Sequence, residues 1–417
     1  MRKLAGIALV CSMVVGAGSA LATNGDNLMG VGPVSRAMGG VGIAMPQDSV
    51  TAIFQNPAAL GACPCGSQSE SVFGATLFDP TVTARITLPT PNGPYTMTAK
   101  SAGQPNMIPA IGVTMSATDK IRLGVGAYGV SGMGVDYRNN GWDLDGNPAN
   151  GYEGDLYTKL EVMKFAGMAS YQALDNLALG ISLNGTYNNL DFEQGGAADY
   201  SFGGQVGVLL DLCSYVSVGA TYRMAEKANH HKVYNFDAFM GDTMQDDLSL
   251  EAPQSMGLGV AVTPTEKVVV EFDVRYLDWA SAEGYEDFDW DSQWVFAVGA
   301  QLLTTEKLIL RCGYNFAKSP VNEHNGWNPQ GVTQIQGKSV STFGYEMLRV
   351  IGFPAVVESH ATIGASYKVT DDFSVHLAYM HAFENTISET SAGGPHAITL
   401  ESDLEEDSYS FSLAWAF

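Results

Sequence analysis

Residues 409–417, at the C-terminus, read YSFSLAWAF, and large apolar side chains alternate there with small ones without interruption. Successive side chains of a β-strand point to opposite faces, so one face of this strand is bulky and apolar and the other is small. In a soluble sandwich the apolar face would point into a core, whereas in a membrane barrel it would point toward lipid.

Similar alternation divides most of the chain into fourteen candidate strands. We place them at 69–88, 104–118, 121–135, 156–171, 175–191, 200–212, 214–227, 248–263, 266–280, 291–304, 306–318, 357–369, 372–386 and 403–417. Every second connection is a turn of a few residues and the others are long and polar, which is typical of outer-membrane barrels, as is an even number of strands. We therefore predict an all-β fold, a transmembrane antiparallel β-barrel of about fourteen strands over residues 69–417.

Charged residues within the strands indicate which face lines the lumen. Glu271, Asp273 and Arg275 alternate with apolar neighbours in one strand. An Arg or Lys that faces lipid near the membrane midplane costs ~2–4 kcal/mol. We therefore expect these three side chains to point into the barrel.

The N-terminus has the features of a secretory signal peptide. Arg2 and Lys3 precede an apolar stretch, and Ala20-Leu21-Ala22 offers a small-residue cleavage site, so we expect residues 1–22 to be removed. No later stretch approaches 18 uninterrupted apolar residues, which argues against a helical membrane protein. The net charge of −23 argues against nucleic acid as a partner.

Four cysteines follow the expected cleavage site. Cys63 and Cys65 are too close in sequence for an unstrained disulfide, and no histidine lies near them to complete a zinc site. We expect a structural or incidental role for these thiols, with no metal site and no cofactor.

Residues 23–68 lack strand alternation. They are rich in glycine and other small residues, with apolar side chains between them. A barrel of fourteen strands is wide enough to contain a channel or a plug. We therefore predict that this segment forms a compact hatch inside the lumen.

The hatch segment resembles that of a known family. Gly25-Asp26-Asn27-Leu28, Gly39-Gly40-Val41-Gly42 and Gln55-Asn56-Pro57-Ala58 are similar to the N-terminal hatch of the FadL/TodX outer-membrane transporters of long-chain fatty acids and other hydrophobic compounds. Leu250-Glu251-Ala252-Pro253, Tyr314-Asn315-Phe316 and Tyr379-Met380-His381 resemble later parts of the family's barrel.

The resemblance implies a monomeric barrel in the bacterial outer membrane, in contact with its lipid and with lipopolysaccharide. It implies passive transport of hydrophobic small molecules. Outer loops would capture the molecule, an apolar lumen pocket would receive it, and a break in the third strand would release it sideways. Long-chain fatty acids, alkanes and aromatic hydrocarbons all require an apolar pocket, so the class of cargo stays open.

The third candidate strand, 121–135, is rich in glycine. It contains Gly124, Gly126, Gly129, Gly132 and Gly134. Glycine weakens a strand and marks bulges or the close approach of another segment. We interpret these residues as the lateral opening. The alternative is that the glycines allow dense packing of this strand against the hatch. The two interpretations are compatible, because a gap beside the hatch requires both an opening in the strand and close packing of the hatch.

Asn56, Pro57 and Ala58 are expected to form a sharp turn in the hatch. One hypothesis packs this turn against the broken third strand, so that movement of the hatch opens the pocket. The other gives the turn a structural role alone.

Ligand contacts are expected in the long loops and in the lumen. Loop 228–247 carries Phe236, Phe239 and Met240, and loop 319–356 carries a second apolar set. These loops form either a landing groove for apolar ligands or a lid. A carboxylate ligand would require a cation. Arg275 and Arg311 are expected to face the lumen, either free for a ligand or paired with wall acids such as Glu271 or Asp273.

Two other functions stay open. An outer-membrane enzyme acting on lipids would need a serine and a histidine at the outer rim, but Ser374 and His376 share a strand face near the other rim. We therefore expect no catalytic residues. A plugged porin for polar solutes is the second alternative, and the hatch argues against it.

Overall fold

The computed structural model describes residues 24–61, 69–102, 105–138, 156–192 and 195–417. The predicted signal peptide at 1–22 lies outside these residues, and so do Cys63 and Cys65. Neither Cys213 nor Cys312 forms a disulfide within the described residues.

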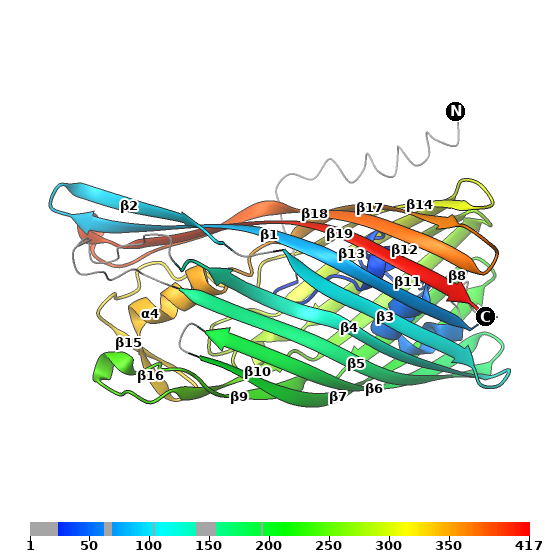
Figure 1. Ribbon diagram of the computed structural model, residues 1–417, viewed down its shortest axis with the longest axis horizontal. Helices are drawn as coiled ribbons and strands as arrows, with labels where there is room; N and C mark the ends of the chain where they lie inside the picture. The colour runs from blue at the N-terminus through cyan, green and yellow to red at the C-terminus, as the bar shows by residue number, and fades with distance from the viewer. Residues whose placement is uncertain (1–23, 62–68, 103–104, 139–155, 193–194) are drawn as a thin grey trace.

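Fourteen antiparallel strands form a closed barrel, as predicted (Figure 1). In wall order they are β1 (Glu70–Thr90), β3 (Asn106–Ser116), β4 (Ile121–Asp136), β5 (Tyr157–Leu174), β6 (Leu177–Phe192), β7 (Gly195–Cys213), β8 (Val216–Arg223), β11 (Ser255–Thr265), β12 (Val268–Leu277), β13 (Gln293–Leu303), β14 (Leu308–Ala317), β17 (Ser359–Lys368), β18 (Phe373–Thr390) and β19 (Thr399–Ala416). The barrel closes where β19 pairs with β1. Closure removes the free sheet edges that a bilayer cannot solvate.

Other elements extend the wall at the rim of long loops. They are β2 (Gly93–Lys100), which lengthens the sheet beside β1, the hairpin of β9 (Glu226–Tyr234) and β10 (Asp246–Ala252), the hairpin of β15 (Val332–Ile335) and β16 (Lys338–Ser341), the helix α4 (Thr342–Glu346) with its π-helical continuation η4 (Met347–Gly352), and the 3-10 turns η2 (Ala238–Met240), η3 (Trp279–Ser281) and η5 (Gly394–His396). In the part of the chain described here, no helix has both the length and the apolar character to cross a membrane.

Tight turns lie at one rim and long loops at the other, as predicted. The turns at 175–176, 214–215 and 266–267 join consecutive wall strands. In outer-membrane barrels the rim of short turns faces the periplasm. The C-terminus lies at this rim in Figure 1, whereas α4, β15 and β16 lie at the opposite end.

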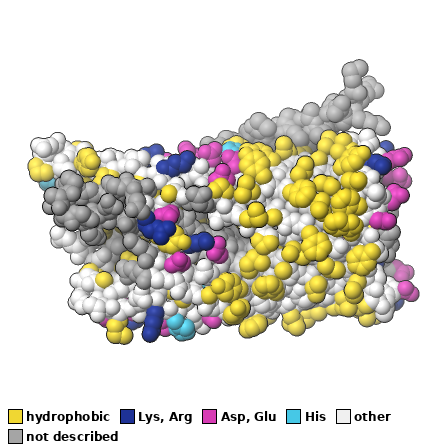
Figure 2. All heavy atoms as spheres, in the orientation of Figure 1, with side chains coloured by type: hydrophobic (Ala, Val, Ile, Leu, Met, Phe, Trp, Pro, Cys, Tyr) yellow, Lys and Arg dark blue, Asp and Glu magenta, His cyan; other side chains and the backbone are white. Residues whose placement is uncertain are grey.

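The outer surface carries the apolar face that the sequence predicts. On β19, Tyr409, Phe411 and Trp415 are 54%, 46% and 41% exposed, while Ser410 and Ser412 between them are buried. Figure 2 shows hydrophobic side chains gathered over the half of the barrel next to the short turns, with charged side chains bordering them. This belt matches the apolar band by which a barrel contacts hydrocarbon.

Residues 24–61 lie inside the lumen. They contain α2 (Gly32–Arg36), α3 (Ser49–Gln55) and the 3-10 turn η1 (Pro57–Gly61), and nearly all of their side chains are buried. In Figure 1 this blue segment sits within the half of the barrel next to the short turns. Because 23 and 68 fall outside the described residues, the expected bounds of the hatch stay predictions. The name hatch is used below for residues 24–61.

The helix α3 is short because the sequence places a stop signal at each end. Asp48 precedes it, and its side chain accepts the backbone N–H of Thr51 at 2.8 Å, which caps the first turn. Pro57 follows Asn56 and cannot continue an α-helix, because it has no N–H group. The chain therefore turns sharply at Asn56, where it meets the wall.

Candidate functional site

Two wall carboxylates hold the middle of the hatch. Glu271 of β12 accepts the backbone N–H groups of Ala44 and Met45, at 2.7 and 3.0 Å. Asp273, two residues along the same strand, accepts those of residues 42 and 43, at 2.9 and 3.2 Å. Both carboxylates are buried and face the lumen, as predicted. These four backbone hydrogen bonds to two neighbouring wall side chains fix this part of the hatch to the wall.

The two lumen arginines do not form the expected contacts. Arg275 donates to the carbonyl of Gly40 at 2.5 Å and to that of Met29 at 3.3 Å, so it bonds the hatch rather than Glu271 or Asp273. Arg311 donates to the side chains of Gln301 and Ser366. No ion pair of either arginine with a wall acid is seen among the described residues, because hatch carbonyls are the partners of Arg275 and wall side chains are those of Arg311.

Asn56, Pro57 and Ala58 form a tight turn against β6 and β7. The Asn56 amide donates to the carbonyls of Ile43 and Val208, at 2.8 and 3.2 Å, and its oxygen accepts the N–H of Ala58 at 3.0 Å. The wall residue at this contact is Gly207 of β7. Any other residue would clash there, because a Cβ at Gly207 would lie 1.9 Å from the Asn56 side-chain oxygen.

The hatch meets β4 at a different residue from the one hypothesised. Ile53 of α3, rather than the turn at Asn56, faces the glycines of β4. A Cβ on Gly126 would lie 3.0 Å from Ile53, and one on Gly124 would lie 3.4 Å from it. These two glycines therefore make room for the hatch.

Gly129, Gly132 and Gly134 lie beyond the last pair between β3 and β4. That ladder ends at Ala110 opposite Tyr128. From there β3 continues along β1 to Asn106, while β4 continues along β5 to Asp136 with a bulge between Gly129 and Ser131. At the far end the N–H of Ala102 donates to the carbonyl of Asp136 at 2.7 Å.

Between these two ends no backbone pair joins β3 to β4 among the described residues. We call this interruption of the ladder the lateral window; it is bordered by residues 106–109 of β3 and 129–135 of β4. A strand edge without partners is unfavourable in a bilayer, since each unsatisfied backbone group costs several kcal/mol. Something other than β3 has to satisfy this part of β4.

The first described residues of the chain supply partners for this edge from inside the barrel. The N–H of Leu28 donates to the carbonyl of Val130 at 2.9 Å, and the N–H of Gly132 donates to the carbonyl of Asp26 at 3.2 Å. Asn27 and Ser131 form the antiparallel bridge between them. Residues 24–28, called the N-terminal segment below, thus lie against the window in place of β3.

Asp26 ties the N-terminal segment to an outer loop. The hydroxyl of Tyr285, in the loop between β12 and β13, donates to its carboxylate. Burial raises the pKa of Asp26 to about 6, although the hydrogen bond from Tyr285 acts in the opposite direction. Sequence reasoning quoted Asp26 as part of a family motif but gave it no contact.

A cavity of about 480 Å³ opens at the lateral window. Its apolar lining includes Met107, Ile108, Pro109, Met133, Val135, Leu160 and Val162. The charged side chains at its edge include Arg138, which is paired with Asp136 at 2.7 Å, and Lys159, which is paired with Glu161 at 2.8 Å. We call it the lateral cavity.

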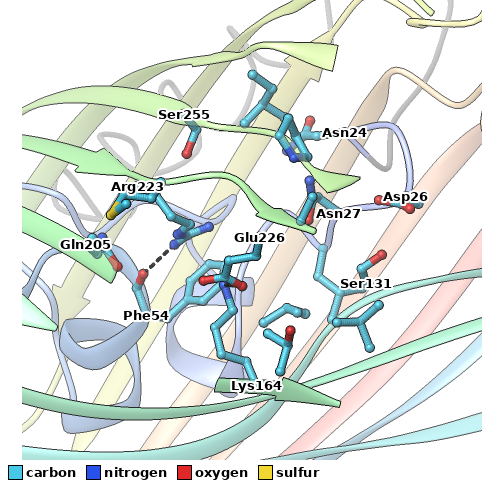
Figure 3. Close-up of a pocket in the computed structure, with 18 of the residues that line it drawn as sticks. Asn24, Asp26, Asn27, Phe54, Ser131, Lys164, Gln205, Arg223, Glu226 and Ser255 are labelled. Carbon is cyan, nitrogen blue, oxygen red and sulfur yellow. Dashed lines mark hydrogen bonds and ion pairs between the residues drawn. The ribbon is translucent and has the colours of Figure 1, made fainter. Parts of the chain in front are cut away.

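A second, more polar cavity of about 50 Å³ lies on the other side of the N-terminal segment (Figure 3). We call it the lumen pocket. Lys164 and Glu226 form a buried ion pair of 2.9 Å in its wall. Arg223 reaches from β8 to the carbonyl of Phe54, at 2.8 Å, and lies over the Phe54 ring. Arg275 lines this pocket, whereas Arg311 lies outside its lining.

The predicted ligand residues of loop 228–247 divide into two groups. Phe236 is buried in a row of aromatic rings that includes Tyr234 and Phe192. Phe239 and Met240 are 49% and 69% exposed at the tip of the loop. The tip of this loop therefore presents apolar surface to an arriving ligand.

Loop 319–356 instead packs over the barrel as a lid. Its apolar residues Tyr345, Leu348, Ile351 and Phe353 are buried. Beneath it lies a third cavity of about 20 Å³, called the loop cavity, whose lining is almost entirely apolar: Met133, Leu160, Leu248, Leu250, Tyr285, Phe288, Trp290, Leu348, Arg349 and Phe353.

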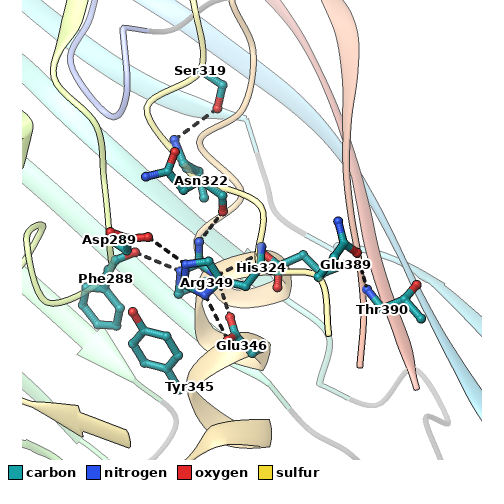
Figure 4. Close-up of polar contacts among 12 residues, drawn as sticks. Phe288, Asp289, Ser319, Asn322, His324, Tyr345, Glu346, Arg349, Glu389 and Thr390 are labelled. Atoms are coloured by element: carbon teal, nitrogen blue, oxygen red, sulfur yellow. Dashed lines mark hydrogen bonds and ion pairs between the residues drawn. The ribbon is translucent and has the colours of Figure 1, made fainter. Parts of the chain in front are cut away.

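A buried charge cluster fastens the lid (Figure 4). Arg349 donates to Glu346 at 2.5 Å, to Glu389 of β18 at 2.9 Å and to the carbonyl of Phe288 at 2.8 Å. His324 bonds Glu346 with one ring nitrogen, at 3.0 Å, and its pKa is raised chiefly by that bond. We call these side chains the Arg349 cluster. His324, Glu346 and Glu389 lie close enough together to ligate a metal, but the Arg349 guanidinium already supplies a cation among them.

The histidine of the enzyme alternative is buried in the barrel. His376 lies 2.5 Å from the hydroxyl of Ser366, which also accepts a hydrogen bond from Arg311. Ser374 lies near the short turns at the start of β18. This arrangement connects wall strands and is remote from the outer rim, where a lipid-cleaving site would be needed.

The chain matches the model of a known protein family. The family model described as "Outer membrane protein transport protein (OMPP1/FadL/TodX)" matches residues 7–326. The toluene transporter TodX of Pseudomonas putida is 18% identical, with 95% of this chain and 100% of that chain covered and a TM-score of 0.67. A FadL homologue of Pseudomonas aeruginosa is 14% identical, with 96% and 100% covered and a TM-score of 0.68. The toluene transporter TbuX of Ralstonia pickettii is 16% identical, with 93% of this chain and 99% of that chain covered and a TM-score of 0.62.

These structural likenesses concern the fold alone, because the identities are low. An uncharacterised protein of Chlorobium limicola, from the 5′ region of a phosphoenolpyruvate carboxykinase gene, is 45% identical over 74 residues. That match covers 18% of this chain and 36% of the relative, so the chain spans about a third of the relative's length.

Removal of the central arginine should loosen the lid. Arg349→Met leaves Glu346 and Glu389 buried without their cation, and breaking a buried pair in this way costs ~3–5 kcal/mol. We expect the free energy of local opening of residues 345–352, measured by hydrogen exchange, to fall by about that amount. The control, Lys227→Met, breaks the exposed ion pair of Lys227 with Glu283 and should change it by less than about 1 kcal/mol. If the two variants lowered this free energy equally, the Arg349 cluster would not be what holds the lid.

Attachment of the N-terminal segment should weaken as the pH rises. The attached state binds the Asp26 proton with a pKa of about 6, against an ordinary value of 3.8 once the segment is released, so acid favours attachment. Linkage then gives about a tenfold loss of attachment between pH 5 and pH 7. The readout is the exchange protection of the Leu28 amide, each rate being divided by that of an unstructured amide at the same pH. Asp26→Asn should abolish this dependence, and an unchanged dependence in that variant would refute the role of Asp26.

Proposed function

This chain belongs to the outer-membrane transport protein family OMPP1/FadL/TodX, and we propose that it carries hydrophobic molecules from its outer loops into the lumen and out sideways through the lateral window. The observation that carries the proposal is the coincidence of the window with the lateral cavity. The β3–β4 ladder stops at Ala110, and at that place an apolar cavity of about 480 Å³ opens. Lateral release would deliver an apolar molecule directly to lipid, without passage through water.

The part of the hatch that moves is the N-terminal segment, and the rest stays in place. Residues 42–45 donate backbone N–H groups to Glu271 and Asp273, and Arg275 holds two hatch carbonyls. The N-terminal segment is attached to β4 by a single bridge and two neighbouring backbone bonds, and to Tyr285 by Asp26. Its displacement alone would connect the lumen pocket with the lateral cavity.

Neutral hydrocarbons are the first class of cargo to test. The lumen cations are largely engaged, since Lys164 is paired with Glu226 and Arg275 bonds hatch carbonyls. The similar structures from Pseudomonas putida and Ralstonia pickettii are described as toluene transporters. Long-chain fatty acids are the second class. For these, Arg223 is the cation to examine. Arg223 and Arg275 both line the lumen pocket with an Nε that has no hydrogen-bond partner among the described residues, but Arg223 bonds one hatch carbonyl where Arg275 bonds two.

The capture site is the tip of loop 228–247, where Phe239 and Met240 are exposed. We propose that the barrel works as a monomer; its wall closes through β19 and β1 and needs no second chain to complete it. Its apolar belt contacts outer-membrane lipid, and the charged rim above the belt lies at the level of lipopolysaccharide head groups.

A side chain placed in the lateral window should block release. Gly132→Leu is suited to this test, since the nearest atom to a Cβ at this position is 3.4 Å away and the residue lines the lateral cavity. A leucine side chain here would narrow the passage, and a rise of ~1.4 kcal/mol in the barrier to passage would lower toluene uptake about tenfold. Uptake is measured by gas chromatography of washed cells that lack a hydrocarbon transporter of their own.

The matched control is Gly167→Leu on the neighbouring strand β5. Gly167 faces outward, and nothing lies within 4 Å of a Cβ built there. This variant should take up toluene as the wild type does. If Gly132→Leu also transports normally while folded, release does not pass through the lateral window.

A further inference from the structure

Three cavities of this protein meet at a single side chain. Leu160 of β5 lines the loop cavity, the lumen pocket and the lateral cavity, and within the described ranges it alone lines all three. Its side chain is buried and faces the lumen. On the wall it lies opposite Met133 of β4 and Leu190 of β6.

Each of the other shared residues lines only two of the three cavities. Leu250 and Tyr285 lie between the loop cavity and the lumen pocket, and Met133 lies between the loop cavity and the lateral cavity. Leu28, Ser131 and Val162 lie between the lumen pocket and the lateral cavity. Leu160 is the residue that all three boundaries share.

The sizes of the cavities make this crossing narrow. A cavity that binds benzene has a volume of about 150 Å³. The lateral cavity, at about 480 Å³, exceeds this, but the lumen pocket and the loop cavity, at about 50 and 20 Å³, do not. A ring-sized molecule can therefore reach the lateral cavity from the loops only if side chains at the junction move aside.

We propose that Leu160 sets the largest cross-section of cargo that this protein passes. The proposal rests on the transport function proposed above and assigns its size selectivity to one side chain. Leu160 suits this role because it is held by two neighbouring strands but makes no polar bond that would have to break. Tyr285, in contrast, is bonded to Asp26, so its movement is coupled to release of the N-terminal segment.

The test compares slim and bulky neutral hydrocarbons in the full-length protein. Toluene and 1,3,5-triisopropylbenzene are offered to cells that lack their own hydrocarbon transporter, and uptake is measured by gas chromatography. The variants are Leu160→Ala, Leu160→Trp and the control Leu190→Ala. Leu190 is the cross-strand neighbour of Leu160 and equally buried, but it lines none of the three cavities. Folding of each variant is verified by its heat-dependent mobility in gel electrophoresis.

One methylene more or less in a hydrophobic pocket changes discrimination by roughly 10–200-fold. Leu160→Ala should therefore raise uptake of the bulky compound relative to toluene at least about tenfold, and Leu160→Trp should lower uptake of both. Leu190→Ala should keep the wild-type ratio. The proposal is overturned if folded Leu160→Ala shows the same ratio as Leu190→Ala. If the wild type takes up neither compound above cells without the protein, the transport function itself fails and the size role falls with it.

Discussion

A backbone group without a hydrogen-bond partner is costly in hydrocarbon, and this barrel ends one of its ladders early. Beyond Ala110 and Tyr128, β3 and β4 separate, and β4 would present an unpaired edge. Residues 26–28 bond that edge from within through Val130 and Gly132. The glycines of β4, the lateral cavity and the position of the N-terminal segment all follow from this one interruption of the wall.

The polar lumen and the hatch solve a second part of the same problem. The hatch backbone has few partners of its own, so wall side chains supply them: Glu271 and Asp273 accept its N–H groups, and Arg275 donates to its carbonyls. These contacts keep most of the hatch fixed. The N-terminal segment is bonded instead to the main chain of β4 and, through Asp26, to Tyr285.

Sequence patterns predicted the wall far better than its contents. Period-two alternation located all fourteen wall strands, because every such strand has one face against lipid and the other against the lumen. It did not separate the hairpin of β9 and β10 from β8 and β11, since the alternation continues past the rim. The pairing of Asn27 with Ser131, and that of Glu389 with Arg349, joins residues far apart in the chain, so neither propensity nor spacing could reveal it. The sequence also showed that β4 is rich in glycine. It could not show which of these glycines lie near Ile53 and which border the window, because that depends on where β3 separates from β4.

The most direct measurement locks the N-terminal segment onto the window. Asn27→Cys and Ser131→Cys, in a background without the native cysteines, place two thiols at an antiparallel bridge, where Cα atoms are typically about 4.5–5.5 Å apart and a disulfide can form. If the segment must leave β4 for release, oxidation will stop toluene uptake and reduction will restore it. Equal uptake by the oxidised and reduced protein would contradict the account.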